Sequence, residues 1–161
     1  MDTPGWHLAQ LNVGIVLAPV EDELMRGFAD GLDPINALAD TAPGFIWRLQ
    51  DDAGTATSFR ISDDDRLLVN MSTWESVDTL HDFVFRTAHT DFLRRRREWF
   101  EVPDAPTAVL WWVPTGHRPS LDAGAERLAA LRADGPTPYA FTLRDRFAPG
   151  EPSAVAADLV D

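Results

Sequence analysis

Residues 67–100 read LLVNMSTWESVDTLHDFVFRTAHTDFLRRRREWF, and this stretch contains the patterns that decide the fold. Up to Trp74, apolar and polar residues alternate as in a strand whose successive side chains point to opposite faces. From Glu75 and Ser76 onward the apolar residues recur with a helical period. A strand followed directly by an amphipathic helix allows the helix to fold back over the strand, so the stretch predicts one part of a layered α+β domain.

The predicted helix after Ser76 has one broad apolar stripe. We expect its buried face to consist of Val77, Leu80, His81, Val84, Phe85 and Ala88. If the helix is unbroken, Phe92, Arg95 and Trp99 extend the same stripe. Thr90 and Asp91 are both good capping residues, and a break there would remove that extension.

Three more strands are predicted on the same grounds, at residues 6–16, 44–50 and 108–113. In the second strand, alternation places Phe45, Trp47 and Leu49 opposite Ile46, Arg48 and Gln50. Between the first two strands, Asp33 and Pro34 resemble a fresh cap and first helical residue, so we expect two linked helices there. Ser120 starts a short helix that Gly135 ends, and residues 139–143 are typical of a small edge strand.

The resulting order is β-α-β-β-α-β followed by a C-terminal helix, which is the ferredoxin-like α+β pattern with an antiparallel sheet. We expect one domain over residues 1–146 and a disordered tail over 147–161, which is mostly Ala, Pro, Asp and Glu. Both sheet faces carry large apolar residues, whereas two helices cover only one face. The other face then needs a partner, and a homodimer is the simplest solution.

The 161 residues carry a net charge of -12 and no cysteine. This charge disfavours nucleic acid and anionic membranes as partners, because both need a basic surface. The absence of cysteine excludes disulfides and thiolate chemistry. No signal peptide and no run of 18 apolar residues is visible, so the cytoplasm is the default compartment.

Polar residues gather on one face of the predicted sheet: Gln10, Asn12, Arg48, Asn70 and Trp74. The first and third strands are neighbours in a ferredoxin-like sheet, so Asn12 is expected near Asn70. A few converging polar groups in an apolar pocket orient a small ligand. The alternative is that these groups satisfy one another's hydrogen bonds.

Titratable and aromatic candidates lie on the helix and on the third and fourth strands. His81 and His89 have the chemistry of a general base or an axial haem ligand, and the alternative for each is a structural histidine. An inward Arg95 needs an anionic partner, either a protein carboxylate or a ligand. Trp74 and Trp112 offer stacking surfaces for a flat ligand, or else belong to the core.

The runs HLAQLNVG, LDPINALAD, GFIWRLQDD, LLVNMSTWES, FLRRRREWF and LWWVPTGHRP resemble a bacterial domain-of-unknown-function family in the dimeric α/β-barrel superfamily, which also includes antibiotic biosynthesis monooxygenases. The resemblance covers roughly residues 6–143. It implies a ferredoxin-like subunit, two sheets joined into a barrel by dimerisation, and a pocket between sheet and helices. It carries over no catalytic residue, because fold does not determine function.

The hypothesis is therefore a homodimer that binds a small hydrophobic or aromatic molecule, with Asn12, Arg48, Asn70, Trp74, His81 and Trp112 as substrate-binding residues. If it is an enzyme, we expect monooxygenase-like or isomerase-like tailoring of an aromatic or enolic substrate without a cofactor or metal. His89 or Arg95 would then handle a proton or an oxyanion. The alternatives are a non-catalytic binding or interaction module and a haem protein.

Overall fold

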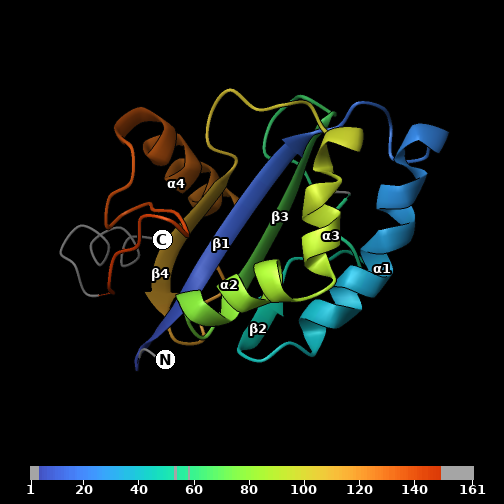
Figure 1. Cartoon of the computed structure of the whole chain (residues 1–161). Coiled ribbons are helices and arrows are strands. Elements are labelled where there is room, and N and C mark those ends of the chain that lie inside the picture. Colours follow the sequence, from blue (N-terminus) through green and yellow to red (C-terminus); the bar gives the residue numbers. More distant parts are fainter. Residues whose placement is uncertain (1–3, 53, 58, 150–161) are drawn as a thin grey trace.

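The computed structural model describes residues 4–52, 54–57 and 59–149 as an α+β chain with a four-stranded antiparallel sheet (Figure 1). The strands are β1 (Trp6–Ile15), β2 (Phe45–Arg48), β3 (Leu67–Trp74) and β4 (Ala108–Pro114). The helices are η1 (Glu23–Met25), α1 (Arg26–Asp40), α2 (Val77–Arg86), α3 (His89–Arg94), η2 (Arg96–Glu98) and α4 (Leu121–Asp134). None of the described helices is long and apolar enough to cross a membrane.

The strand order is β2-β3-β1-β4, and each strand runs antiparallel to its neighbours. The central pair, β1 and β3, is in register from Leu8 opposite Trp74 to Ile15 opposite Leu67. The predicted adjacency of the first and third strands is therefore confirmed. Alternation along these strands divides the apolar residues between two faces, and each face has its own buried cluster.

A β-bulge changes the predicted faces of β2. The register shifts between Phe45 and Trp47, so these two residues no longer share a face. The ring of Phe45 packs edge-on against Trp74, with centroids 5.4 Å apart, whereas Trp47 packs in the cluster on the other side of the sheet. The simple alternation predicted for this strand was wrong, because an inserted residue reverses the side-chain directions beyond it.

The region between β1 and β2 contains one main helix, so the prediction of two linked helices was wrong. After the short η1, α1 continues through Pro34 to Asp40. Proline inside a helix removes one backbone hydrogen bond, but the apolar side of α1 keeps the helix docked on the sheet. Ile35 and Leu38 pack against the cluster that contains Trp74.

The helical stretch after β3 does break, but earlier than Thr90–Asp91. α2 ends at Arg86, Thr87 is extended, and α3 starts at His89. The hydroxyl of Thr87 donates to the Phe83 carbonyl at 2.6 Å and accepts from the His89 amide at 3.2 Å, which satisfies backbone groups at both helix ends.

The buried face of α2 also differs from the prediction. Phe83 is buried together with Val77 and Leu80, while Phe85 is 45% exposed. A helical wheel places residues 83 and 85 on nearly opposite sides, so the true contact face is rotated from the predicted stripe. The start of α2 is set by a capping box, in which Ser76 and Thr79 bond to each other's backbone amides.

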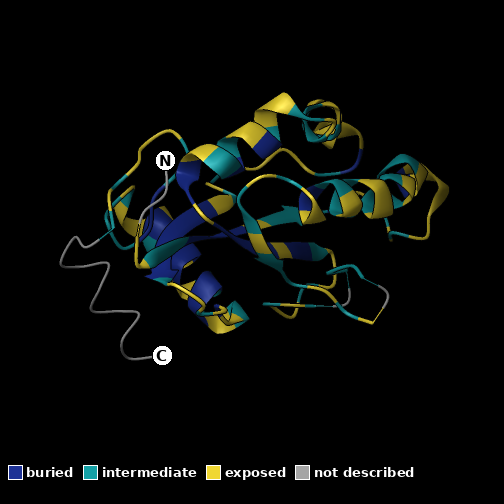
Figure 2. Ribbon diagram, turned by 90° about the horizontal axis from the view of Figure 1, so that it is seen from below, coloured by how far each residue is buried: buried dark blue, intermediate teal, exposed yellow. Residues whose placement is uncertain are grey.

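The second sheet face is covered within the single chain, which contradicts the premise of the dimer argument. α4 lies on the side opposite α1, α2 and α3, and Figure 2 shows the buried strands between two outer layers. α4 lies so close to β1 that a Cβ on Gly124 would stand 2.5 Å from the Leu11 Cδ1 atom. Residues Leu49, Phe59 and Ile61 pack against the same cluster beside α4. Because this face is covered by α4, it does not provide an argument for a partner chain.

The segment after α4 returns to the sheet. Phe141 forms an isolated bridge with Leu110 of β4, with backbone bonds of 2.8 and 2.9 Å, where a small edge strand was expected. Phe147 packs against the cluster that contains Trp112, and its carbonyl accepts a hydrogen bond from the Trp112 indole. Phe147 is the first residue of the predicted disordered tail, residues 147–161, and it is packed; residues 150–161 of that tail lie outside the described residues.

Candidate functional site

Two asparagines face each other in the middle of the sheet. Asn12 of β1 is in register with Asn70 of β3, and both side chains lie on the face that carries Leu8 and Trp74. Although α1, α2 and α3 cover this face, both asparagines are exposed. In Figure 1, α2 crosses the strands near one end and α3 runs alongside β3. The centre of the face therefore carries a polar group of residues, which we call the amide floor: the exposed Asn12 and Asn70 and the buried Gln10 and Ser72.

A hydrogen-bond chain beneath the exposed amides determines their orientation. The Nε2 atom of Gln10 donates to Asn70 Oδ1 at 2.9 Å and to Ser72 Oγ at 2.7 Å. The indole Nε1 of Trp74 donates to the same Ser72 oxygen at 2.9 Å. Gln10, Ser72 and Trp74 are all buried, so the chain is held rigidly in the sheet. Some of the predicted polar residues therefore form hydrogen bonds with one another, as the alternative interpretation expected.

The two candidate tryptophans lie below the surface. Trp74 is 1% exposed and packs between Phe45 and Phe83. Trp112 is 3% exposed, and its indole donates to the Phe147 carbonyl at 2.8 Å. In this structure both rings are buried and neither offers a surface for a stacked ligand. Trp74 supports the floor through its hydrogen bond to Ser72, whereas Trp112 belongs to the core.

Arg48 has protein partners. Its Nε atom lies 2.7 Å from Asp40 Oδ1 at the end of α1, and its Nη1 donates to the Gly54 carbonyl at 2.6 Å. This arginine ties α1 and the loop after β2 to the sheet edge beside Ser72, with which it is in register. Its guanidinium is thereby neutralised by a carboxylate.

His89 lies at the start of α3 and is connected to the floor through aromatic contacts. Its ring centroid is 5.1 Å from Phe83, which in turn lies 5.2 Å from Trp74. Burial lowers the pKa of His89, and the hydrogen bond to the Val84 carbonyl raises it in part. The Nδ1–H donates to that carbonyl at 3.3 Å, so the neutral ring carries its unprotonated nitrogen at Nε2.

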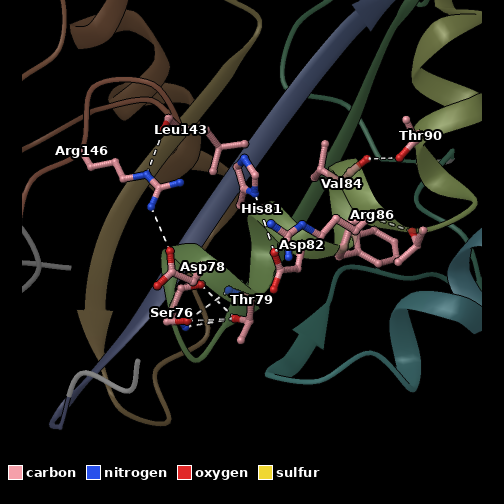
Figure 3. Close-up of polar contacts among 12 residues, drawn as sticks. Ser76, Asp78, Thr79, His81, Asp82, Val84, Arg86, Thr90, Leu143 and Arg146 are labelled. Carbon is pink, nitrogen blue, oxygen red and sulfur yellow. Dashed lines mark hydrogen bonds and ion pairs between the residues drawn. The ribbon is translucent and has the colours of Figure 1, made fainter.

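His81 lies on the outer part of α2 (Figure 3). Its side chain is 38% exposed, its ring packs on Phe85 with centroids 4.8 Å apart, and its Nδ1 is 3.8 Å from Asp82. Close by, Arg146 from the C-terminal segment forms a 3.0 Å ion pair with Asp78. The predicted buried position of His81 was wrong, because the face of α2 that meets the sheet is the one with Phe83.

Arg95 is exposed, so its predicted inward position was also wrong. Its guanidinium pairs with both carboxylate oxygens of Glu98 at 2.9 and 3.1 Å and lies 4.7 Å above the Trp99 ring. The ion pair raises the pKa of Arg95. His89 is the first residue of α3 and Arg95 lies just after its last, so the two predicted catalytic residues are at opposite ends of this helix. Their contacts are with different residues, Val84 and Phe83 for His89 and Glu98 and Trp99 for Arg95.

Two hollows lie away from the amide floor. One, of about 530 Å³, is a shallow apolar groove between α4 and residues 61–67. The other, of about 750 Å³, lies at the end of the sheet between residues 16–21 and the loop before β3. None of the predicted site residues lines either hollow. Among the described residues, no three His, Cys, Asp or Glu side chains are grouped to hold a metal ion.

Two important polar residues were not singled out from the sequence. Ser72 joins Gln10 to Trp74, and its signal was its place between Asn70 and Trp74 on the same strand face. Arg127 of α4 is 1% exposed, lies 3.9 Å above the Tyr139 ring and donates to the Tyr139 carbonyl. The sequence feature that could have indicated its burial is its spacing of three or four residues from Ala123, Gly124 and Leu131, which places all four on one face of the helix.

Comparison with known proteins gives a family and a distant structural likeness. A solved structure with the description "Structural Genomics, protein YJCS" is 15% identical, covers 70% of this chain and 99% of its own, and has a TM-score of 0.40. No curated protein matches the sequence. The model of the family described as "Domain of unknown function (DUF3291)" matches residues 7–157. The predicted membership of a domain-of-unknown-function family is thus confirmed, and the chain belongs to the DUF3291 family.

Proposed function

We propose that this domain binds a small, largely hydrophobic or aromatic molecule on the amide floor. The observation that carries the proposal is the exposed pair Asn12 and Asn70, at the centre of a face that helices otherwise cover. Exposed amides above a buried, oriented hydrogen-bond chain form a preorganised surface, and preorganisation lowers the cost of ligand binding. The aromatic rings beneath and beside them, Trp74 and Phe83, provide the apolar surroundings.

His89 favours a catalytic form of this proposal. A half-buried imidazole with a lowered pKa and with Nε2 unprotonated has the state required of a general base near neutral pH. The reaction would be a cofactor-independent tailoring step, an oxygenation or isomerisation of an enolic substrate, in which Asn12 and Asn70 orient the substrate and His89 accepts its proton. The alternative is a binding module on the same surface. A purified protein without a Soret band would eliminate the haem alternative.

We further propose that the fold is the ferredoxin-like subunit of a dimeric α/β barrel. The element order β-α-β-β-α-β and the antiparallel order β2-β3-β1-β4 support the subunit fold. The homodimer is supported by the sequence resemblance and by the edge strand β2, which leaves Ile46 39% exposed. Because α4 covers the second sheet face, pairing through that face would require α4 to share the interface.

The binding proposal is tested by thermal-shift screening of neutral and charged phenols, enols and aryl amides. A true ligand raises the melting temperature of the wild type and loses this effect in Asn70→Ala. The matched control is Asn36→Ala on α1, where the amide bonds to Gly54 instead. Hits that stabilise all three proteins equally would place binding elsewhere and refute the proposed site. For a ligand that does bind, turnover by the wild type that is lost in His89→Asn, with affinity retained, separates enzyme from binding module.

A further inference from the structure

The hydrogen-bond pattern of the amide floor leaves one acceptor without a partner. Both Nε2 hydrogens of Gln10 are used, by Asn70 Oδ1 and by Ser72 Oγ. Its Oε1 atom has no hydrogen-bond partner among the described residues, and the residue as a whole is 8% exposed. Because the oxygen is not among the fully buried atoms without a partner, it can accept a hydrogen bond from a ligand or from water.

The same pattern leaves donors beside that acceptor. Because Asn70 Oδ1 accepts from Gln10, the Nδ2 group of Asn70 is free to donate, and within the described part of the chain it has no acceptor. Ser72 Oγ already accepts from Gln10 and Trp74, so further bonding by its hydroxyl is by donation. The floor thus offers a fixed acceptor next to fixed donors.

The arginine in register with Ser72 on the neighbouring strand is already paired with protein groups. Arg48, the nearest arginine along the sheet, is paired with Asp40 and the Gly54 carbonyl. Arg95 is paired with Glu98, and burial lowers the pKa of His89, which disfavours its cationic form. The whole chain carries a net charge of -12. An anion on the floor would therefore meet the lone pairs of Gln10 Oε1 without a counter-charge.

From this arrangement we infer that the site selects a neutral ligand with a hydrogen-bond donor beside an acceptor, the donor bonding to Gln10 Oε1 and the acceptor to Asn70 Nδ2, and that it rejects the corresponding carboxylate. The inference rests on the proposed function, since it names the ligand class of the same surface. Primary amides, lactams and enolised carbonyl compounds belong to this class. Rejection follows because a carboxylate has only acceptors and would leave Gln10 Oε1 facing another oxygen.

Benzamide and benzoate test the inference, because they share size and ring and differ in the amide nitrogen. The readout is the set of side-chain amide signals in ¹⁵N-labelled protein, which is small because the chain has three asparagines and two glutamines. We expect benzamide to shift the signals of Gln10, Asn12 and Asn70 but not those of Asn36 and Gln50. Its affinity should exceed that of benzoate by about tenfold or more.

The variant Asn70→Asp keeps an oxygen for Gln10 and removes the donors for the ligand. We expect it to weaken benzamide binding by about tenfold, whereas Asn36→Asp, which adds the same charge away from the floor, should not. Equal binding of benzoate and benzamide at the three floor amides would overturn the neutral-ligand inference and leave the binding function standing. Failure of both probes to move these signals would overturn the proposed function itself.

Discussion

Replacing Ser72 with alanine removes the oxygen on which the amide floor is built. In the native protein this oxygen accepts from Trp74 Nε1 at 2.9 Å and from Gln10 Nε2 at 2.7 Å. Trp74 is 1% exposed, so its indole N–H would be left without an acceptor or access to water. Gln10 would retain its bond to Asn70.

The magnitude follows from these two donors. A buried donor left without a partner costs about 1–3 kcal/mol, and the loss of one bond by a group that keeps another costs about 0.5–1.5 kcal/mol. We therefore expect Ser72→Ala to lower the free energy of unfolding by about 2–4 kcal/mol. In urea, with a slope of about 2 kcal/mol per molar, the midpoint would fall by about 1–2 M at unchanged slope.

Urea denaturation followed by tryptophan fluorescence and circular dichroism measures this change. The control is Ser62→Ala, because Ser62 is exposed and accepts only from the Asp64 amide. Its effect should stay within about 0.5 kcal/mol. Adding Trp74→Phe to Ser72→Ala removes the orphaned donor, so the double variant should be more stable than the sum of the single effects predicts. A loss below about 0.5 kcal/mol in Ser72→Ala would refute the buried chain.

Gly124→Leu should lower the melting temperature, since added atoms would overlap Leu11 and overpacking costs about 1–3 kcal/mol; a rise, as helix propensity alone predicts, would show that α4 does not dock there. His89→Asn should reduce the loss of unfolding free energy that the wild type shows as the pH falls below neutral. Burial lowers the native pKa of His89, so its stabilising contribution is complete above the unfolded value of about 6.5 and is lost as pH falls below it. If the free energy of unfolding fell equally in the variant and the wild type between pH 7.5 and pH 5, this prediction would be wrong. Sedimentation at micromolar concentration should show the proposed homodimer, and a single subunit would refute it.

Local patterns were enough to locate β1, β3 and β4 and to predict that the first and third strands are neighbours, but they missed the β-bulge in β2. Alternation located β3 at its observed bounds and β1 and β4 within one residue at an end, and the element order placed Asn12 beside Asn70. These features depend on side-chain periodicity and on short connections, both of which are visible in a single sequence. The amide pair, which is the centre of the candidate site, was therefore predictable.

Features that depend on contacts between residues far apart in the sequence could not be predicted from local patterns. A helical stripe shows that a helix is amphipathic, but it does not show where the helix docks, so the cover of α4 on the second sheet face was missed. Likewise, the outward positions of Arg95 and His81 depend on how α2 and α3 are rotated against the sheet. The sequence alone determined the strands and the amides that they present. Only the tertiary structure decided which side chains are covered, because burial depends on packing between parts of the chain that are far apart in sequence.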